Sequence, residues 1–173
     1  MWDGSTRDAW VLATWTALLH GTGDRAARED VVKACDTLVF ANFGQPTRDA
    51  GARLVEAIAA VITESGSVES AVVALFGDRA GQTFSAATRD ERSQRLRAYD
   101  FKMGLPWLAR LWKRHEDGEV RPGWEVILSV DTHAHILDPN PYDDLDENLD
   151  LPLADFHVLW ELSGAAHVHL KRA

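Results

Sequence analysis

Apolar residues recur at helical spacing in the first part of the chain and alternate with polar residues in the last part. Residues 7–20 are apolar or small almost throughout, which is typical of a buried helix. The segments 24–39, 47–65 and 68–76 each carry one apolar stripe and each stop at a glycine-containing break. The pattern therefore predicts four helices before residue 77.

Two more helices are predicted between residues 88 and 117. Thr88-Arg89-Asp90-Glu91 has the form of a capping box, and Pro106 stands at the tolerated first position of the next helix. Together these helices would present a basic face next to Trp107 and Trp112. Its candidate partner-binding residues are Arg92, Arg95, Arg110, Lys113 and Arg114. A solvated helix face is the favoured interpretation, and a docking surface for a phosphate or an acidic partner is the alternative.

After residue 123 the apolar period changes to two, which indicates strands over 124–135, 156–162 and 166–170. A three-residue hairpin loop, Ser163–Ala165, would pair Glu161 with His167 and keep histidines off the apolar face, whereas a two-residue loop would not. We therefore expect an α+β fold in one compact domain. Its helical region (1–117, five to six helices) would precede a β region (118–173) with a small, mainly antiparallel, three-stranded sheet.

The predicted strands concentrate histidine, since five of the seven histidines lie between residues 133 and 173. His133 and His135 form one i, i+2 pair, and His167 and His169 form another. Two histidines at this spacing on a strand point the same way, so both imidazoles can reach one metal ion. The four histidines are thus candidate ligands for Zn²⁺ or another divalent metal, although a histidine on an exposed strand face is more often a surface residue without a ligand.

Between the first two predicted strands lies an acidic loop, 136–155. Its acidic residues from 138 onward are accompanied by no Lys or Arg, and several prolines exclude a long helix. The loop lacks the central glycine and ligand spacing of an EF-hand, so a solvated surface loop is favoured over a calcium site. Asp143, Asp144 and Asp146 are its candidate partner-binding residues.

The net charge of −9 is unevenly distributed. Residues 1–120 carry 15 basic and 17 acidic side chains, whereas residues 121–173 carry 3 and 10. The whole chain is therefore repelled by nucleic acid, which it could bind only locally within a complex. The abundance of Ala, Arg and Asp suggests a bacterial or phage genome rich in GC.

Two further features bear on the class of protein. Cys35 lies on the apolar stripe of its predicted helix with no neighbour that would lower its pKa, so we interpret it as a small buried hydrophobe. The apolar stretch 10–19 is too short to span a bilayer and follows a net negative segment, unlike a signal peptide. We therefore expect a cytoplasmic protein without a membrane segment.

Two functions remain open. The first is an interaction or accessory protein that docks on a protein partner, or on a second copy of itself, through its acidic, histidine-rich region or its basic helix face. The second is a small zinc-type hydrolase in which His133, His135 and one or both of His167 and His169 hold the ion and Asp131 or Glu161 is the general base. Since no complete catalytic motif is present, the first is the preferred hypothesis and enzymatic activity stays undecided.

Overall fold

The computed structural model describes residues 4–39, 48–80, 105–114, 118–137 and 149–170. Within them the fold is α+β, as predicted, with five α-helices and one antiparallel sheet of five strands where three were expected. The elements in chain order are α1 (Gly4–Gly21), α2 (Glu29–Val39), α3 (Arg48–Ser65), α4 (Val68–Phe76), the 3₁₀ helix η2 (Gly77–Arg79), β1 (Trp107–Arg114), β2 (Val120–Val130), β3 (His133–Leu137), β4 (Leu149–Pro152), α6 (Leu153–Leu162) and β5 (His167–Val168).

α1 is enclosed by other elements along most of its length. Leu12, Trp15 and Leu19 have no exposed surface, and the helix packs against α2, α3 and β2. The Trp15 indole donates a hydrogen bond to the Pro106 carbonyl at 2.8 Å, which ties α1 to the start of β1. The apolar composition of this segment therefore predicts its burial correctly.

α4 confirms the predicted bounds at both ends. Ser67 caps its first turn by accepting a hydrogen bond from the Ser70 backbone N–H at 3.1 Å. Gly77 follows the last turn with a φ of 58°, a conformation that glycine adopts without steric cost. The helix predicted from the capping box at Thr88 lies outside the described residues.

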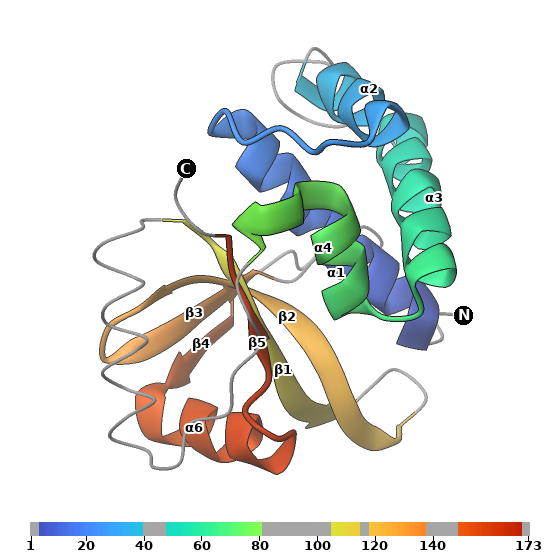
Figure 1. Cartoon of the computed structure of the whole chain (residues 1–173). Coiled ribbons are helices and arrows are strands. Elements are labelled where there is room, and N and C mark those ends of the chain that lie inside the picture. Colours follow the sequence, from blue (N-terminus) through green and yellow to red (C-terminus); the bar gives the residue numbers. More distant parts are fainter. Residues whose placement is uncertain (1–3, 40–47, 81–104, 115–117, 138–148, 171–173) are drawn as a thin grey trace.

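The sheet has the strand order β4-β3-β2-β1-β5 and lies between two helical layers (Figure 1). The helices α1 to α4 lie on one face and α6 lies on the other. Leu108 and Val126 join the core beneath α1, whereas Ala109 and Ile127 join the core beneath α6. β1 and β2 therefore bury apolar side chains on both faces of the sheet.

Residues 107–114 form β1, so the helix predicted there is wrong. Trp107 and Ala109 face α6 while Leu108 faces α1, and all three are buried. By periodicity alone, such an apolar run fits a buried strand as well as a buried helix. Arg110, Lys113 and Arg114 of the expected basic helix face therefore belong to a strand, and strand structure begins ahead of residue 118.

The opposite error occurs at residues 153–162, which form α6 instead of the predicted strand. Phe156 and Trp160 on its inner side have no exposed surface. Val158 and Leu162 on its outer side are 46% and 59% exposed. Apolar residues on both sides of this short helix produced the alternation that resembles a strand.

The turn predicted at Ser163–Ala165 ends α6 and does not join two strands. The Ala165 N–H donates to the Trp160 carbonyl at 2.8 Å, and Ala165 has a left-handed φ of 54°. The chain then enters β5, which pairs with β1. The predicted pairing of Glu161 with His167 is therefore wrong.

β4 lies inside the expected acidic loop, 136–155. It pairs with β3 as the edge strand of the sheet and ends at Pro152, which has no N–H to offer a further strand. Asp143, Asp144 and Asp146 lie outside the described residues. Part of the segment is thus a strand.

Candidate functional site

Asp131 shapes the tight turn between β2 and β3. Its carboxylate accepts a hydrogen bond from the His133 backbone N–H at 2.9 Å, and its own N–H donates to the His133 carbonyl at 2.9 Å. Aspartate commonly forms turns by bonding to the backbone two residues further on. The Asp131 side chain is still 62% exposed, so the turn presents a carboxylate at the surface.

His135 lies between two carboxylates. Its Nδ1 is 2.7 Å from Asp150 Oδ1, and its Nε2 is 3.1 Å from both oxygens of Asp131. The hydrogen bond with Asp150, followed by that with Asp131, raises the pKa of His135 above 6.5. In turn, the His133 N–H and then the His135 ring lower the pKa of Asp131.

This arrangement favours an imidazolium with both ring nitrogens donating. In that form His135 has no lone pair with which to bind a metal ion or accept a proton. With Asp131 and Asp150 ionised, the three side chains together carry one net negative charge. The group can therefore present negative charge at the surface, because the ring between the two carboxylates holds them in place.

His133 lies on the same face of β3 as His135. Among the described residues, no hydrogen bond between the two rings is seen. Its Nδ1 is 3.0 Å from the Thr132 hydroxyl, and its side chain is exposed. Within the described part of the chain, no three His, Cys, Asp or Glu side chains are grouped as a metal ion requires.

His167 and His169 lie at the opposite edge of the sheet, in and just after β5. Their rings stack at a centroid distance of 4.7 Å, and the residues are 0% and 7% exposed. His167 also makes an edge contact with Trp107, at 5.0 Å, in the layer beneath α6. Both rings are therefore buried and do not lie on an exposed strand face.

The two histidine pairs do not converge. β2 and β1 separate β3 from β5, so the pairs are three strand spacings, about 14 Å, apart. Ala134 and Ile136 of β3 face α6, so His133 and His135 point to the opposite face, away from His167. One ion about 2 Å from each ligand does not span this distance.

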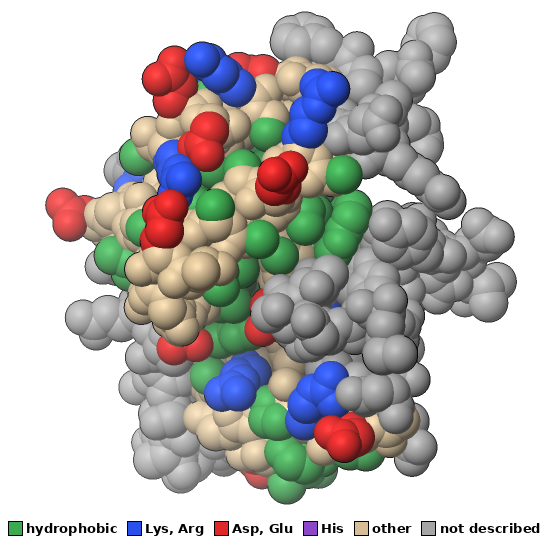
Figure 2. All heavy atoms as spheres, turned by 90° about the vertical axis from the view of Figure 1, so that its right-hand side faces the viewer, with side chains coloured by type: hydrophobic (Ala, Val, Ile, Leu, Met, Phe, Trp, Pro, Cys, Tyr) green, Lys and Arg blue, Asp and Glu red, His purple; other side chains and the backbone are tan. Residues whose placement is uncertain are grey.

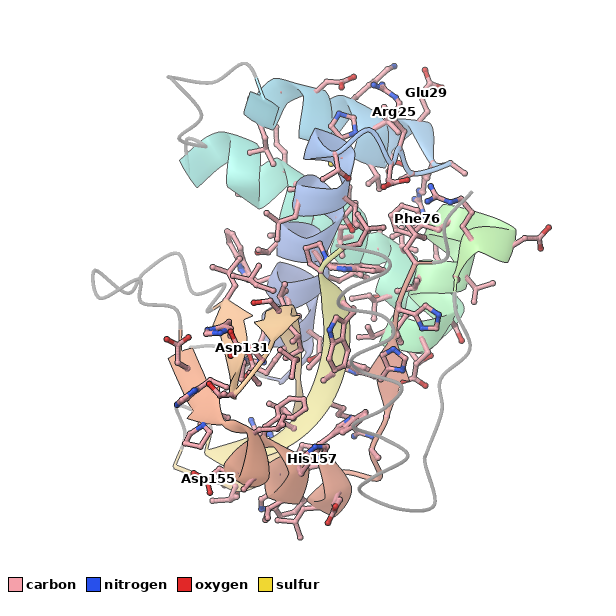
Figure 3. All side chains as sticks on the ribbon, turned by 90° about the vertical axis from the view of Figure 1, so that its left-hand side faces the viewer. Arg25, Glu29, Phe76, Asp131, Asp155 and His157 are labelled. Carbon is pink, nitrogen blue, oxygen red and sulfur yellow. The ribbon has the colours of Figure 1, made fainter. Side chains whose placement is uncertain are left out.

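The proposed general bases, Asp131 and Glu161, are also held apart. The N–H of Leu153 at the start of α6 donates to the Thr132 carbonyl at 3.1 Å, beside Asp131. Glu161 lies eight residues further along α6, about 12 Å along its axis. Figure 3 shows Asp155, in the first turn of α6, on the same side of the molecule as Asp131.

Three of the candidate basic residues lie on a strand instead of the predicted helix. Arg110 is exposed on β1, where its N–H donates to the Ala166 carbonyl at 3.1 Å. Lys113 and Arg114 belong to the same strand. Arg92 and Arg95 lie outside the described residues. The three candidates that the structure describes therefore lie on β1 and not on a helical face.

A second charged cluster, at the start of α1, was not singled out by the sequence pattern. Arg7 donates to the Trp124 carbonyl and to the Glu125 carboxylate, both at 2.6 Å, and Asp8 accepts a hydrogen bond from the Trp124 N–H. Because β3 pairs with β2 only from Val126 onward, the Trp124 peptide lies on an open stretch of β2. Arg7 and Asp8 supply the donor and acceptor that a neighbouring strand would supply. Adjacent charges opening an apolar helix are the signal that could have found this contact.

Residues of α2 and α3 line an open groove of about 540 Å³. Acidic and basic side chains both line it, and Figure 2 shows the two signs interspersed on that part of the surface. The lining residues are Asp30, Lys33, Ala34, Thr37, Arg53, Glu56, Ala57 and Ala60. The helical layer therefore lacks the single charge sign of the C-terminal region.

Cys35 is buried, as the pattern predicted. Its side chain joins the core beneath the helices with 2% exposure. Burial, and then the Asp36 charge, raise the pKa of its thiol to about 11. The thiol therefore stays protonated at neutral pH, which disfavours a nucleophilic role.

Membrane-span criteria and comparisons with known proteins add little to the choice of function. No single helix among the described residues is long and apolar enough to cross a membrane. Gly51–Ser65 and Val68–Arg79 meet the length and composition criteria only as a pair, which is bent by 107°. No protein-family model, curated protein or solved structure shows significant similarity to the chain. The function must be inferred from the molecule's own surface.

Proposed function

We propose that the chain is an interaction protein that binds a basic protein partner through an acidic surface around β3 and β4. One observation carries this proposal: residues 122–170 contain ten Asp or Glu and no Lys or Arg. The carboxylates of Asp131 and Asp150, which the structure leaves exposed on either side of the His135 ring, define the acidic face.

Charge of one sign favours a partner of the opposite sign. It speeds the encounter with basic proteins and repels nucleic-acid phosphates. Recognition by strand addition is disfavoured, because the edge strand β4 has only four residues and ends at Pro152. Side chains are therefore the means of recognition in this proposal.

The acidic face is also preorganised. His135 holds the carboxylates of Asp131 and Asp150 at hydrogen-bonding distance. Both side chains are more exposed than the His135 ring between them. Side chains that are ordered before binding lose less conformational entropy when a partner arrives. A rigid pair of carboxylates is thus better suited to bind a cation than two freely rotating ones.

Affinity capture from the native host, with chemical cross-linking, tests the proposal. The wild-type chain should enrich a basic protein, and Asp131→Asn/Asp150→Asn should reduce that enrichment at least about fivefold. The matched control, Glu56→Gln/Asp78→Asn, removes two charges from the helical layer and should retain the partner. Equal enrichment by both double variants, or cross-links confined to α2 and α3, overturns the proposal.

A further inference from the structure

β2 extends beyond the strand that pairs with its outer side. β1 pairs with β2 from Val120 to Ile127, whereas β3 pairs with it only from Val126 onward. Among the described residues, the segment 120–125 therefore has a neighbouring strand on one side only. Its other side is a strand edge, the β2 edge. Exposed backbone groups on such an edge are a template on which another strand can pair.

Every second residue of the β2 edge directs its backbone N–H and C=O outward. Trp124 does so, because its two backbone groups bond to side chains of α1. Its partner on β1, Arg110, donates its N–H to Ala166 on the far side of β1, so this pair is of the kind that exchanges no backbone hydrogen bonds. Backbone direction repeats every two residues in an antiparallel ladder, so Val120 and Pro122 have the same orientation as Trp124.

Two side chains near the start of α1 bond to the outward groups of Trp124. Arg7 donates to the carbonyl oxygen at 2.6 Å, and Asp8 accepts a hydrogen bond from the N–H. The Arg7 guanidinium also donates to the Glu125 carboxylate at 2.6 Å, and both of those side chains are largely buried. Leu12, one turn further along α1, has no exposed surface, so the core fixes the helix that carries them. Arg7 and Asp8 thus form the edge plug, which occupies the hydrogen-bonding positions of a neighbouring strand.

Pro122 removes a hydrogen-bond donor from the next outward position. Proline has no N–H, so within sheets it is confined to places where the strand needs no donor. Pro122 pairs with Trp112 of β1, yet its nitrogen lies on the outer side of β2. The ladder between β1 and β2 therefore loses no hydrogen bond, whereas a strand added at the β2 edge would lose one.

We propose that the edge plug and Pro122 together close the β2 edge and prevent a second copy of the chain from pairing there. A second copy brings the same edge, and two identical edges pair in antiparallel orientation about a two-fold axis. With that axis at Pro122, the two prolines would face each other without a donor, and Trp124 of each chain would meet Val120 of the other. Val120 is 44% exposed, so an unprotected edge would also offer an apolar contact. No residue of the acidic face takes part, so this inference does not depend on the proposed function.

Sedimentation velocity over a series of concentrations tests the proposal with variants that remove each part of the closure. Arg7→Ala/Asp8→Ala/Glu125→Ala, the plug-free variant, removes the plug together with the carboxylate that would otherwise lose its arginine inside the protein. Pro122→Thr restores the missing donor while the plug stays in place, and threonine suits a strand. The open-edge variant combines the plug-free variant with Pro122→Thr. Urea unfolding checks that each variant folds.

The open-edge variant should form a species of about twice the wild-type mass, since two free edges can then pair. The plug-free variant should do so only at higher concentration, and Pro122→Thr alone should keep the wild-type mass. The control Arg28→Ala/Asp30→Ala removes an ion pair of 2.8 Å from the helical layer and should also keep that mass. Hydrogen exchange in the larger species should show new protection confined to residues 120–124.

Exchange of the Trp124 amide in dilute solution tests the plug by itself. Asp8→Ala removes the acceptor of this N–H, so the amide should exchange at least about tenfold faster than in the wild type. Asp8→Asn retains a carbonyl oxygen as acceptor and should keep the amide protected. Should the plug-free variant fail to fold, Asp8→Ala/Pro122→Thr keeps the ion pair of Arg7 with Glu125 and takes the place of the open-edge variant.

A folded open-edge variant that keeps the wild-type mass at every concentration overturns the proposal. The same increase in mass for the control, or new protection outside the β2 edge, also overturns it, because the added contact would then lie elsewhere. Unchanged exchange of the Trp124 amide in Asp8→Ala would show that the plug does not hold this edge.

Discussion

Replacing Asp8 by asparagine tests how the N-terminal part of α1 joins the sheet. The Asp8 carboxylate accepts the Trp124 N–H and lies beside Arg7, which bonds to the carbonyl of the same residue. Burial outweighs these favourable contacts and raises the pKa of Asp8 from 3.8 to about 6. The ionised carboxylate is therefore less stable in the folded chain than in the unfolded chain.

The size and sign of the effect follow from this shift. About two pKa units correspond to about 3 kcal/mol of folding free energy. Because the folded pKa lies above the unfolded one, the folded chain retains a proton between pH 3.8 and about 6. The free energy of unfolding thus falls as the pH rises through that window and stays lower above it. An asparagine side chain is neutral at every pH, so Asp8→Asn should gain about 2 to 3 kcal/mol at pH 7.

Thermal and urea unfolding between pH 4 and 7.5 measure this difference. At pH 7 the midpoint of Asp8→Asn should rise by about 2 to 4 °C per kcal/mol, and near pH 4 it should match the wild type. Asp36→Asn is the control, since the hydrogen bond from His20, followed by Arg25, lowers the pKa of Asp36. That variant should be less stable at neutral pH. The reasoning fails if Asp8→Asn keeps the wild-type pH dependence or is less stable at pH 7.

Three further predictions address other parts of the fold. NMR titration should give His135 a pKa above 6.5, and Asp150→Asn should lower it; an unchanged value would exclude the hydrogen bond as the cause. Trp160→Ala should lower the free energy of unfolding in urea by about 3 to 5 kcal/mol, because its side chain is fully buried. Val158→Ala should change it by no more than about 0.5 kcal/mol, because that side chain is exposed. Similar losses in both variants would contradict the orientation of α6. Glu125→Gln should destabilise by about 3 kcal/mol, because it leaves the largely buried arginine of α1 without its carboxylate; a neutral effect would show that other groups compensate.

Local signals predicted the helical layer well. α1 and α4 follow from an apolar segment and from a serine cap with a terminal glycine, which act within one or two turns of chain. The common direction of His133 and His135 also follows, since side chains alternate along any strand. In each case the determining contacts are short in sequence.

β1 was predicted as a helix and α6 as part of a strand. Apolar periodicity shows which residues are buried but not which elements cover each face. Leu108 and Ala109 are adjacent and both buried, because helices lie on both sides of the sheet. On α6, Val158 is exposed although it is apolar, and this broke the pattern of a half-buried helix. What covers each side of β1 and of α6 cannot be inferred from the sequence of either segment alone.

The sequence alone determined the α+β class, the positions of four helices and the segregation of acidic charge, since each depends on composition or on nearby residues. The tertiary structure decided which functional side chains meet. Strand order separates the two histidine pairs, β4 brings Asp150 to His135, and α1 brings Asp8 to Trp124. These contacts join residues up to 116 positions apart in the chain, as Asp8 and Trp124 are, and only the packing of helices on the sheet brings them together.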